Sequence, residues 1–170
     1  MSIELYMIRH GLAGEHGSYP NDEERPLTEA GHKKTKRVAE RLRDLGLKFD
    51  LILTSPLVRA RQTAEILYTT GLSEQLEETR HLAPEGRFEH WLAWFEDWRK
   101  LAGESLAIVG HEPNLSTWAE MLIWGQSPGR IVMKKAGVIG LLLPAEGSPA
   151  GQSDLFWLSP PRFLINVNSG

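Results

Sequence analysis

Short apolar runs divide this chain and predict five strands. Three short runs rich in apolar residues are too short for helices and suit strands covered on both faces: residues 3–8, FDLILTSP at 49–56 and SLAIVG at 105–110. Residues 131–143 and DLFWL at 154–158 predict two further strands. The Gly, Pro and Ser residues of the segment between them favour a hairpin.

Helical signals occupy the stretches between these strands. Thr28 precedes a segment with apolar residues at helical spacing, and Gly46 suits the left-handed position after its end, which predicts a helix over 29–45. Pro56 opens a second helix that continues to about residue 68. Pro113 opens another in the segment LSTWAEMLIWG.

An aromatic segment, RFEHWLAWFEDWRKL at 87–101, predicts one more helix. Its apolar residues fall near one face, and they are Phe88, Trp91, Leu92, Phe95 and Leu101. We interpret this face as core packing. The alternative is a docking surface for a partner protein, since exposed aromatic patches often bind proteins.

The alternation of strands and helices predicts an α/β fold. We expect a three-layer arrangement in which a mainly parallel sheet carries helices on both faces and the last two strands form an antiparallel flank. A loop at 14–27, rich in Gly, Pro, Asn and Asp, should overhang the end of the first strand. No linker divides the chain, so residues 1–170 are predicted to form a single domain.

The composition narrows the classes of function. With 19 Lys and Arg against 22 Asp and Glu, the net charge of −3 offers no overall basic field for nucleic acid or an anionic membrane. The absence of cysteine excludes disulfides and thiolate chemistry and fits a reducing cytoplasm. No leader and no uncharged apolar stretch of roughly 18 residues is found, so we expect a cytoplasmic protein.

Cationic side chains follow three of the predicted strands. Arg9 and His10 end the first, Ser55 and Arg59 follow the second, and His111 follows the strand at 105–110. In open sheets of this kind, ligands bind beyond the carboxyl ends of the strands. A lone histidine there is more often structural than catalytic. Together, however, these cations would repel one another unless a multiply charged anion, such as a phosphoryl group, neutralised them.

Four motifs in this order resemble a known family: RHG after the first strand, RPLTEAG at the start of the first helix, TSPLVRARQTA after the second strand and VGHEPNLS after a later one. The sequence over roughly 3–124 resembles the histidine phosphatase superfamily, which has the phosphoglycerate mutase-like fold. The short chain and its ending FWLSPPR are most similar to the SixA-type phosphohistidine phosphatases.

The resemblance implies roles for four residues, and the long loop adds a fifth candidate. His10 would be the nucleophile that attacks phosphorus and forms a phosphohistidine intermediate, which water then hydrolyses. Arg9, Arg59 and His111 match the positions that bind phosphoryl oxygens and stabilise the transition state. Arg25, in the long loop, is a further candidate for substrate binding, although a solvated loop charge is the simpler interpretation.

The sequence differs from relatives that cleave phosphoesters in the residue that serves as general acid. No carboxylic acid of the middle segment aligns with theirs, and Glu77, Glu78 and Glu85 all remain candidates. An alkoxide leaving group needs a proton from such an acid, whereas an imidazole is a better leaving group. The short connections at 71–85 and 125–130 also leave little material for a lid.

We therefore expect a metal-independent hydrolase without a cofactor that removes phosphate from phosphohistidine in a protein. A histidine-containing phosphotransfer domain in a signalling pathway is a plausible substrate, and a monomer is expected. The alternatives are a broad phosphomonoesterase and a non-catalytic module that binds phosphate or phosphohistidine. A mutase fits less well because it needs a closed site. A zinc site at His10 and His111 is opposed by the two neighbouring arginines.

Overall fold

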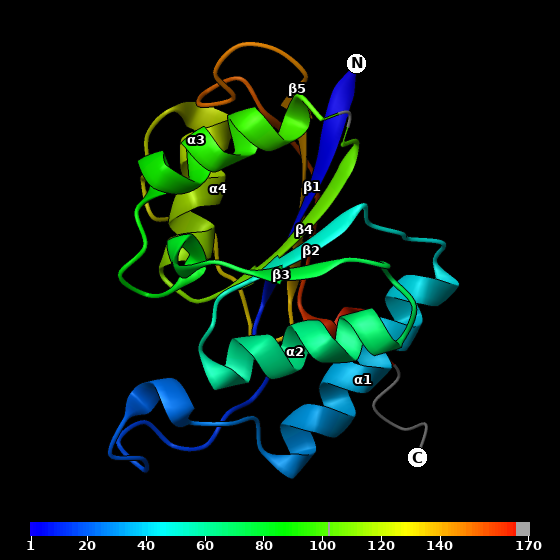
Figure 1. Ribbon diagram of the computed structural model, residues 1–170, viewed down its shortest axis with the longest axis vertical. Coiled ribbons are helices and arrows are strands. Elements are labelled where there is room, and N and C mark those ends of the chain that lie inside the picture. The colour runs from blue at the N-terminus through cyan, green and yellow to red at the C-terminus, as the bar shows by residue number, and fades with distance from the viewer. Residues whose placement is uncertain (102, 166–170) are drawn as a thin grey trace.

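A computed structural model describes residues 1–101 and 103–165 and contains one six-stranded sheet (Figure 1). Its strands are β1 (Ser2–Arg9), β2 (Leu51–Thr54), β3 (Leu76–Glu78), β4 (Ser105–Gly110), β5 (Val138–Pro144) and β6 (Asp154–Ser159). The strand order is β3-β2-β4-β1-β5-β6. The first four strands of this order are parallel, β5 runs antiparallel to β1, and β6 runs antiparallel to β5. The predicted parallel sheet with an antiparallel flank is confirmed.

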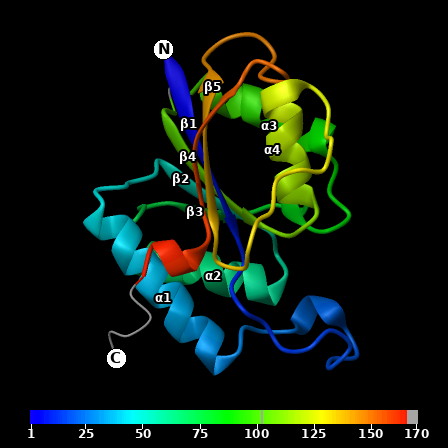
Figure 2. The same cartoon turned by 180° about the vertical axis from the view of Figure 1, so that it is seen from behind.

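Helices cover both faces of the sheet, as the alternating pattern predicts. They are α1 (Glu29–Asp44), α2 (Val58–Thr69), α3 (Phe88–Arg99) and α4 (Asn114–Trp124), with short 3-10 turns η1 (Asp22–Glu24), η2 (Arg80–Leu82) and η3 (Pro161–Phe163). The helices α1 and α2 lie on one face and α3 and α4 on the other (Figures 1 and 2). The three layers of the predicted α/β fold are therefore present.

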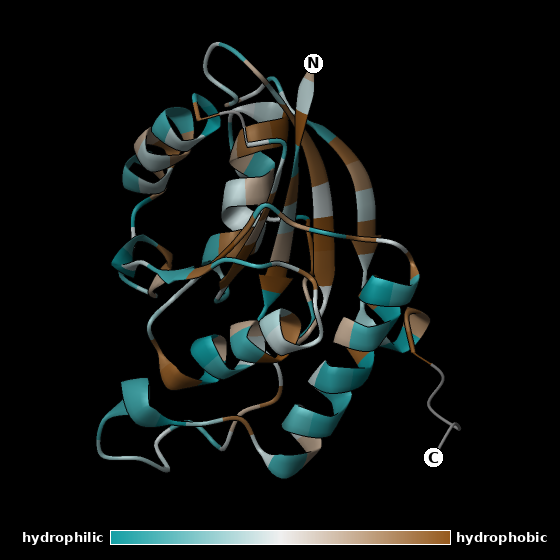
Figure 3. Ribbon diagram, turned by 45° about the vertical axis from the view of Figure 1, so that its right-hand side comes forward, coloured by the Kyte–Doolittle hydropathy of each residue, from teal (hydrophilic) through white to brown (hydrophobic). Residues whose placement is uncertain are grey.

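The central strand β1 buries side chains on both faces of the sheet. Leu5 and Met7 pack into the core under α3 and α4, whereas Tyr6 and Ile8 pack into the core under α1 and α2. Each fully buried aliphatic side chain stabilises the fold by roughly 1.5–3 kcal/mol. The strands are accordingly apolar, and the exposed sides of the helices are polar (Figure 3).

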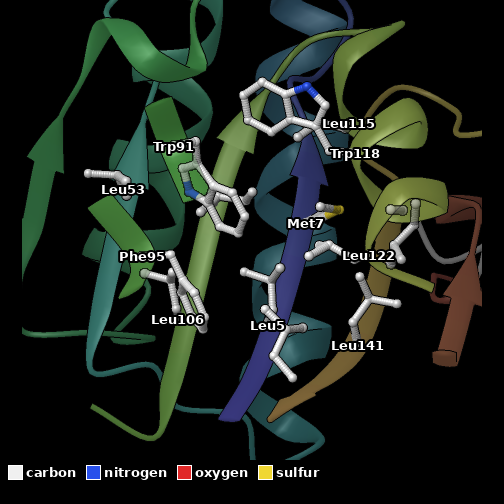
Figure 4. Packing of buried hydrophobic residues seen from close by; sticks show 14 of the residues in the cluster. Leu5, Met7, Leu53, Trp91, Phe95, Leu106, Leu115, Trp118, Leu122 and Leu141 are labelled. Atoms are coloured by element: carbon white, nitrogen blue, oxygen red, sulfur yellow. The ribbon is translucent and has the colours of Figure 1, made fainter. Parts of the chain in front are cut away.

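The aromatic helix α3 belongs to the core. Trp91 and Phe95 are fully buried, and Trp91 stacks on Phe95 and on Trp118 of α4 with ring centroids 5.5 and 5.8 Å apart (Figure 4). The interpretation as core packing is confirmed. Leu101 is the exception to the predicted face, since it is 81% exposed. It lies beyond the helix end at Arg99, where the helical periodicity no longer applies.

Two segments differ from the predicted strands. The segment 131–143 becomes a strand only from Val138, because residues 131–137 form an irregular turn. Within that turn, the backbone N–H of Ala136, a residue with a φ of 60°, donates to the carbonyl oxygens of Arg9 and His10 instead of joining a ladder. The middle segment also contributes the short edge strand β3, which its mixed composition does not reveal.

The residues predicted to cap α1 do so in the structure. The side chain of Thr28 accepts a hydrogen bond from the N–H of Gly31 and so caps α1. Gly46, with a φ of +87°, takes the left-handed position just after α1.

Within the described part of the chain, no helix has the length and apolar character needed to cross a membrane.

Candidate active site

The carboxyl ends of three neighbouring parallel strands create the site. The strand β4 lies between β1 and β2, with Gly110 in register with Arg9 and Val109 in register with Thr54. The next residue along each strand is therefore brought to the same edge: His10 after β1, Ser55 after β2 and His111 after β4. The ring centroids of the two histidines are 5.2 Å apart.

The hydrogen bonding of His10 fixes which ring nitrogen is free to react. Its Nδ1 lies 2.7 Å from the carbonyl oxygen of Gly11. A carbonyl oxygen can only accept a hydrogen bond, so Nδ1 carries the proton. The lone pair of the neutral ring is consequently on Nε2, which is the atom that a nucleophilic role requires.

The surroundings of His10 keep its ring neutral. The side chain is buried, and burial is the main cause that lowers its pKa to about 3. The nearby His111, Arg59 and Arg9 act in the same direction, because a positive ring would be repelled by them. At neutral pH, His10 therefore retains an unprotonated nitrogen.

His111 is held by Ser55 from the neighbouring strand end. Its Nε2 lies 2.8 Å from Ser55 Oγ, which already accepts a hydrogen bond from the N–H of Leu57. The serine hydroxyl can donate to or accept from Nε2, because it has one proton and two lone pairs. The other ring nitrogen of His111, Nδ1, is buried and has no partner among the described residues. Burial, followed by Arg59, lowers the pKa of His111 to about 3, so its ring is neutral at neutral pH and carries a single N–H.

Arg59 is buried and is occupied by an aspartate of the long loop. Its Nη1 donates to the backbone oxygen of Asp22 at 2.9 Å, and its Nη2 to Asp22 Oδ2 at 3.1 Å. Asp22 Oδ1 accepts from Nε of Arg25 at 2.9 Å, and Arg25 also donates to the carbonyl oxygen of Gly14. The carboxylate of Asp22 thus joins both arginines, whereas Nε of Arg59 is buried and has no partner among the described residues.

The sequence reasoning missed Asp22. Its spacing of three residues from Arg25, within a loop predicted to overhang the first strand, was the available signal. The hydrogen bond from Arg25 is the main cause that lowers the pKa of Asp22, and the charge of Arg59 contributes as well. Asp22 is therefore ionised at neutral pH and has no proton to give to a leaving group.

Arg9 links the site to the turn before β5. Its Nη1 donates to the carbonyl oxygen of Met133 at 2.9 Å, whereas its Nε is buried and has no partner among the described residues. Burial lowers the pKa of Arg9, and the nearby Glu112 opposes this effect. Arg9 therefore has a donor available beside His10.

Lys135 is a second residue that the sequence reasoning missed. Burial lowers its pKa, and Arg9, Arg25 and Arg59 act in the same direction, so its ammonium lies within the positive field of the site. It precedes a strand that runs antiparallel to β1, and such a strand begins at the edge where β1 ends. The predicted antiparallel flank was therefore a usable signal.

Gly11 holds two helices close to His10. Its N–H donates to Thr63 Oγ1 at 3.0 Å, and Thr63 in turn donates to the carbonyl oxygen of Arg59. A Cβ at Gly11 would collide with Oγ1 of Thr35 on α1. The glycine thus allows α1 to approach closely, and its N–H fixes α2, which carries Arg59.

The three glutamates considered as general acids lie apart from this cluster. Glu78 is 3.9 Å from Arg61, Glu85 pairs with Arg80, and Glu77 borders another cleft. Within residues 1–101 and 103–165, none of the three has a hydrogen bond or ion pair with the histidines or arginines of the site. The same residues contain no group of three or more His, Asp or Glu suited to a metal ion.

Comparisons with known proteins agree with this geometry. Residues 5–112 match the family model of the histidine phosphatase superfamily (branch 1). An uncharacterised protein of Picosynechococcus sp. is 45% identical over 164 residues, which are 96% of this chain and 99% of that protein. A mitochondrial serine/threonine-protein phosphatase Pgam5 of Drosophila willistoni is 40% identical over 63 residues, or 37% of this chain and 21% of that protein.

Solved structures share the fold at low identity. The protein histidine phosphatase SixA complexed with tungstate has a TM-score of 0.83 at 22% identity, and the alignment covers 96% of this chain and 100% of that one. A phosphoglycerate mutase from Bacillus anthracis has a TM-score of 0.66 at 15% identity, with 96% and 95% covered. The predicted phosphoglycerate mutase-like fold is confirmed, and the chain belongs to the histidine phosphatase superfamily.

Proposed function

We propose that this protein is a phosphatase that hydrolyses phosphohistidine in a protein, with His10 as the covalent nucleophile. The observation that carries the proposal is the state of His10. Its Nδ1 proton is bound to the carbonyl oxygen of Gly11, its ring is neutral, and Arg9, Arg59 and His111 lie around it. This arrangement supplies one nucleophilic nitrogen and several donors for a dianion.

The first half of the reaction transfers the phosphoryl group to the enzyme. Nε2 of His10 forms a bond to phosphorus while the bond between phosphorus and the substrate imidazole breaks. The substrate leaves as neutral histidine when its other ring nitrogen already carries a proton. Arg59 and the N–H of His111 stabilise the charge on the phosphoryl oxygens during this step.

The second half of the reaction hydrolyses the intermediate. Water forms a bond to phosphorus, the bond to Nε2 breaks, and His10 returns to its neutral form with the proton on Nδ1. Both protons of the water end on inorganic phosphate, which leaves as the monoanion. Both halves of the reaction break a bond between phosphorus and an imidazole nitrogen. Hydrolysis of phosphohistidine therefore needs no type of leaving group that the hydrolysis of the enzyme intermediate does not also need.

The state of Asp22 supports this choice of substrate. An alkoxide leaving group needs a proton from a positioned acid, and Asp22 is ionised by its contacts with Arg25 and Arg59. The geometry therefore favours phosphohistidine over a phosphoester. We place the protein in the cytoplasm, acting without a metal or cofactor on a phosphorylated signalling protein such as a histidine-containing phosphotransfer domain.

A broad phosphomonoesterase is the second candidate, and two observations favour it. The relative named a serine/threonine-protein phosphatase matches part of this chain, and Glu112 lies close enough to Arg9 to influence its pKa. Values of kcat/KM for a phosphohistidine peptide and for an alkyl phosphate decide between the two. Faster hydrolysis of the ester would overturn the preference for phosphohistidine.

Trapping of the intermediate tests catalysis itself. A reaction quenched in alkali, which preserves phosphohistidine, should show phosphate on His10 by mass spectrometry. His10→Ala should abolish both the adduct and turnover, while His32→Ala, at an exposed position on α1, should leave both intact. A protein that binds phosphohistidine without turnover or adduct would instead be a non-catalytic module.

A further inference from the structure

An open cleft of about 800 Å³ begins at Arg9 and extends away from the phosphate-binding residues. It lies between α1, the turn at 131–137 and the segment that joins β6 to η3, which sits beside α1 (Figure 2). Its apolar lining is aliphatic and includes Leu12, Val132, Leu158 and Pro160. Leu12, Val132 and Leu158 are 42%, 69% and 43% exposed, so an apolar surface is open to solvent.

Basic side chains surround this apolar lining. Lys34, Lys134, Lys135 and Arg162 line the cleft together with Arg9, and no acidic side chain lines it. Among the residues that the structure describes, none of these five takes part in an ion pair with an acid. The chain as a whole carries a net charge of −3, so this local excess of positive charge is opposite in sign to the rest of the protein.

The wall of the cleft is fixed to the nucleophile strand. The N–H of Ala136 donates to the carbonyl oxygens of Arg9 and His10 at 3.0 and 3.2 Å, and the N–H of Arg9 donates to the carbonyl oxygen of Gly137. The side chain of Arg9 holds the carbonyl oxygen of Met133. One end of a molecule bound in the cleft therefore lies next to the phosphate site.

We propose that this cleft binds an acidic segment of the substrate protein next to its phosphohistidine. The inference rests on the proposed function and specifies the sequence around the phosphorylated residue. Carboxylates of that segment match the basic rim, and an apolar side chain among them matches the aliphatic lining. The lining contains no aromatic side chain on which bases could stack, which favours a polypeptide over a nucleic acid.

Charge reversal at Lys34 and Lys134 tests the proposal, because both side chains are exposed and neither belongs to the phosphate site. The matched control is Lys36→Glu with Lys48→Glu, which reverses two exposed lysines outside the cleft. The substrates are two phosphohistidine peptides that differ only in flanking Asp or Asn residues. N-phosphoimidazole reports the chemistry without any flanking segment, and urea unfolding shows whether each variant is folded.

The expected result is a KM for the Asp peptide at least about tenfold higher in the Lys34→Glu, Lys134→Glu variant, with kcat within about twofold of the unchanged protein. Turnover of N-phosphoimidazole should stay unchanged, and the control variant should behave as the parent does. Equal KM values for the Asp and Asn peptides in the parent protein, or equal losses in the two variants, would overturn the proposal.

Binding separates failure of this inference from failure of the proposed function. Absence of phosphohistidine hydrolysis would refute the function, while fluorescence anisotropy with an unphosphorylated Asp peptide still reports on the cleft. Loss of that binding in the Lys34→Glu, Lys134→Glu variant alone would support the acidic segment. Tighter binding of a single-stranded oligonucleotide, lost in the same variant, would overturn it in favour of a nucleic acid.

Discussion

The buried histidines predict a specific loss of stability in mild acid. The folded state lowers the pKa of His10 and His111 to about 3, whereas the value in an unfolded chain is about 6.5. Below 6.5 the unfolded chain therefore binds more protons than the folded one. A group whose pKa is lowered on folding contributes stability above its unfolded pKa, and that contribution declines as the pH falls towards the folded pKa.

The magnitude follows from these values. Between pH 7.5 and 5.5, an unfolded histidine goes from about 10% to about 90% protonated, while the folded rings remain neutral, so each histidine costs ~1.4 kcal/mol of unfolding free energy. The two contributions add to about 3 kcal/mol because neither ring is charged in the folded state over this range. Asp22 and Glu85, whose pKa values folding also lowers, titrate below this window even when unfolded.

Urea unfolding followed by tryptophan fluorescence in phosphate-free buffer measures this difference. The unfolding free energy should fall by about 3 kcal/mol from pH 7.5 to pH 5.5, and the double variant His10→Asn, His111→Asn should lose most of that pH dependence. His32→Asn, on the exposed side of α1, is the matched control and should retain it. A parent protein whose stability changes by less than about 0.5 kcal/mol would refute the buried neutral histidines.

Three further outcomes follow from named contacts. Asp22→Ala removes the carboxylate that occupies Arg59, so inorganic phosphate should bind about tenfold more tightly in calorimetry; weaker binding would contradict competition for this arginine. Gly11→Ala should destabilise the fold by about 1–3 kcal/mol through its collision with Thr35, and Thr35→Ala should restore part of that loss in a double-mutant cycle; full additivity would place the cost elsewhere. Phe95→Ala should lower the unfolding free energy by about 3–5 kcal/mol, and a smaller loss would mean that the core under α3 collapses to fill the cavity.

The elements of the fold could be predicted because they depend on local chemistry. An apolar run such as 105–110 has to be covered on both faces. Thr28 marks the start of a helix because its side chain accepts a hydrogen bond from the first turn, and Gly46 marks the end because glycine can adopt a positive φ. The turn at 131–137 was misassigned as strand for the opposite reason. Its conformation is set by hydrogen bonds to Arg9 and His10, residues more than 120 positions away in the sequence.

The sequence by itself determined which residue types follow each strand. Because parallel strands end at the same edge of a sheet, this was enough to predict a candidate site made of Arg9, His10, Arg59 and His111. Only the tertiary structure decided their protonation and partners. Burial makes both rings neutral, the long loop brings Asp22 onto Arg59, and the turn before β5 brings Lys135 into the field of the site. Solvation and charge act through space, so neither can be deduced from the order of residues along the chain.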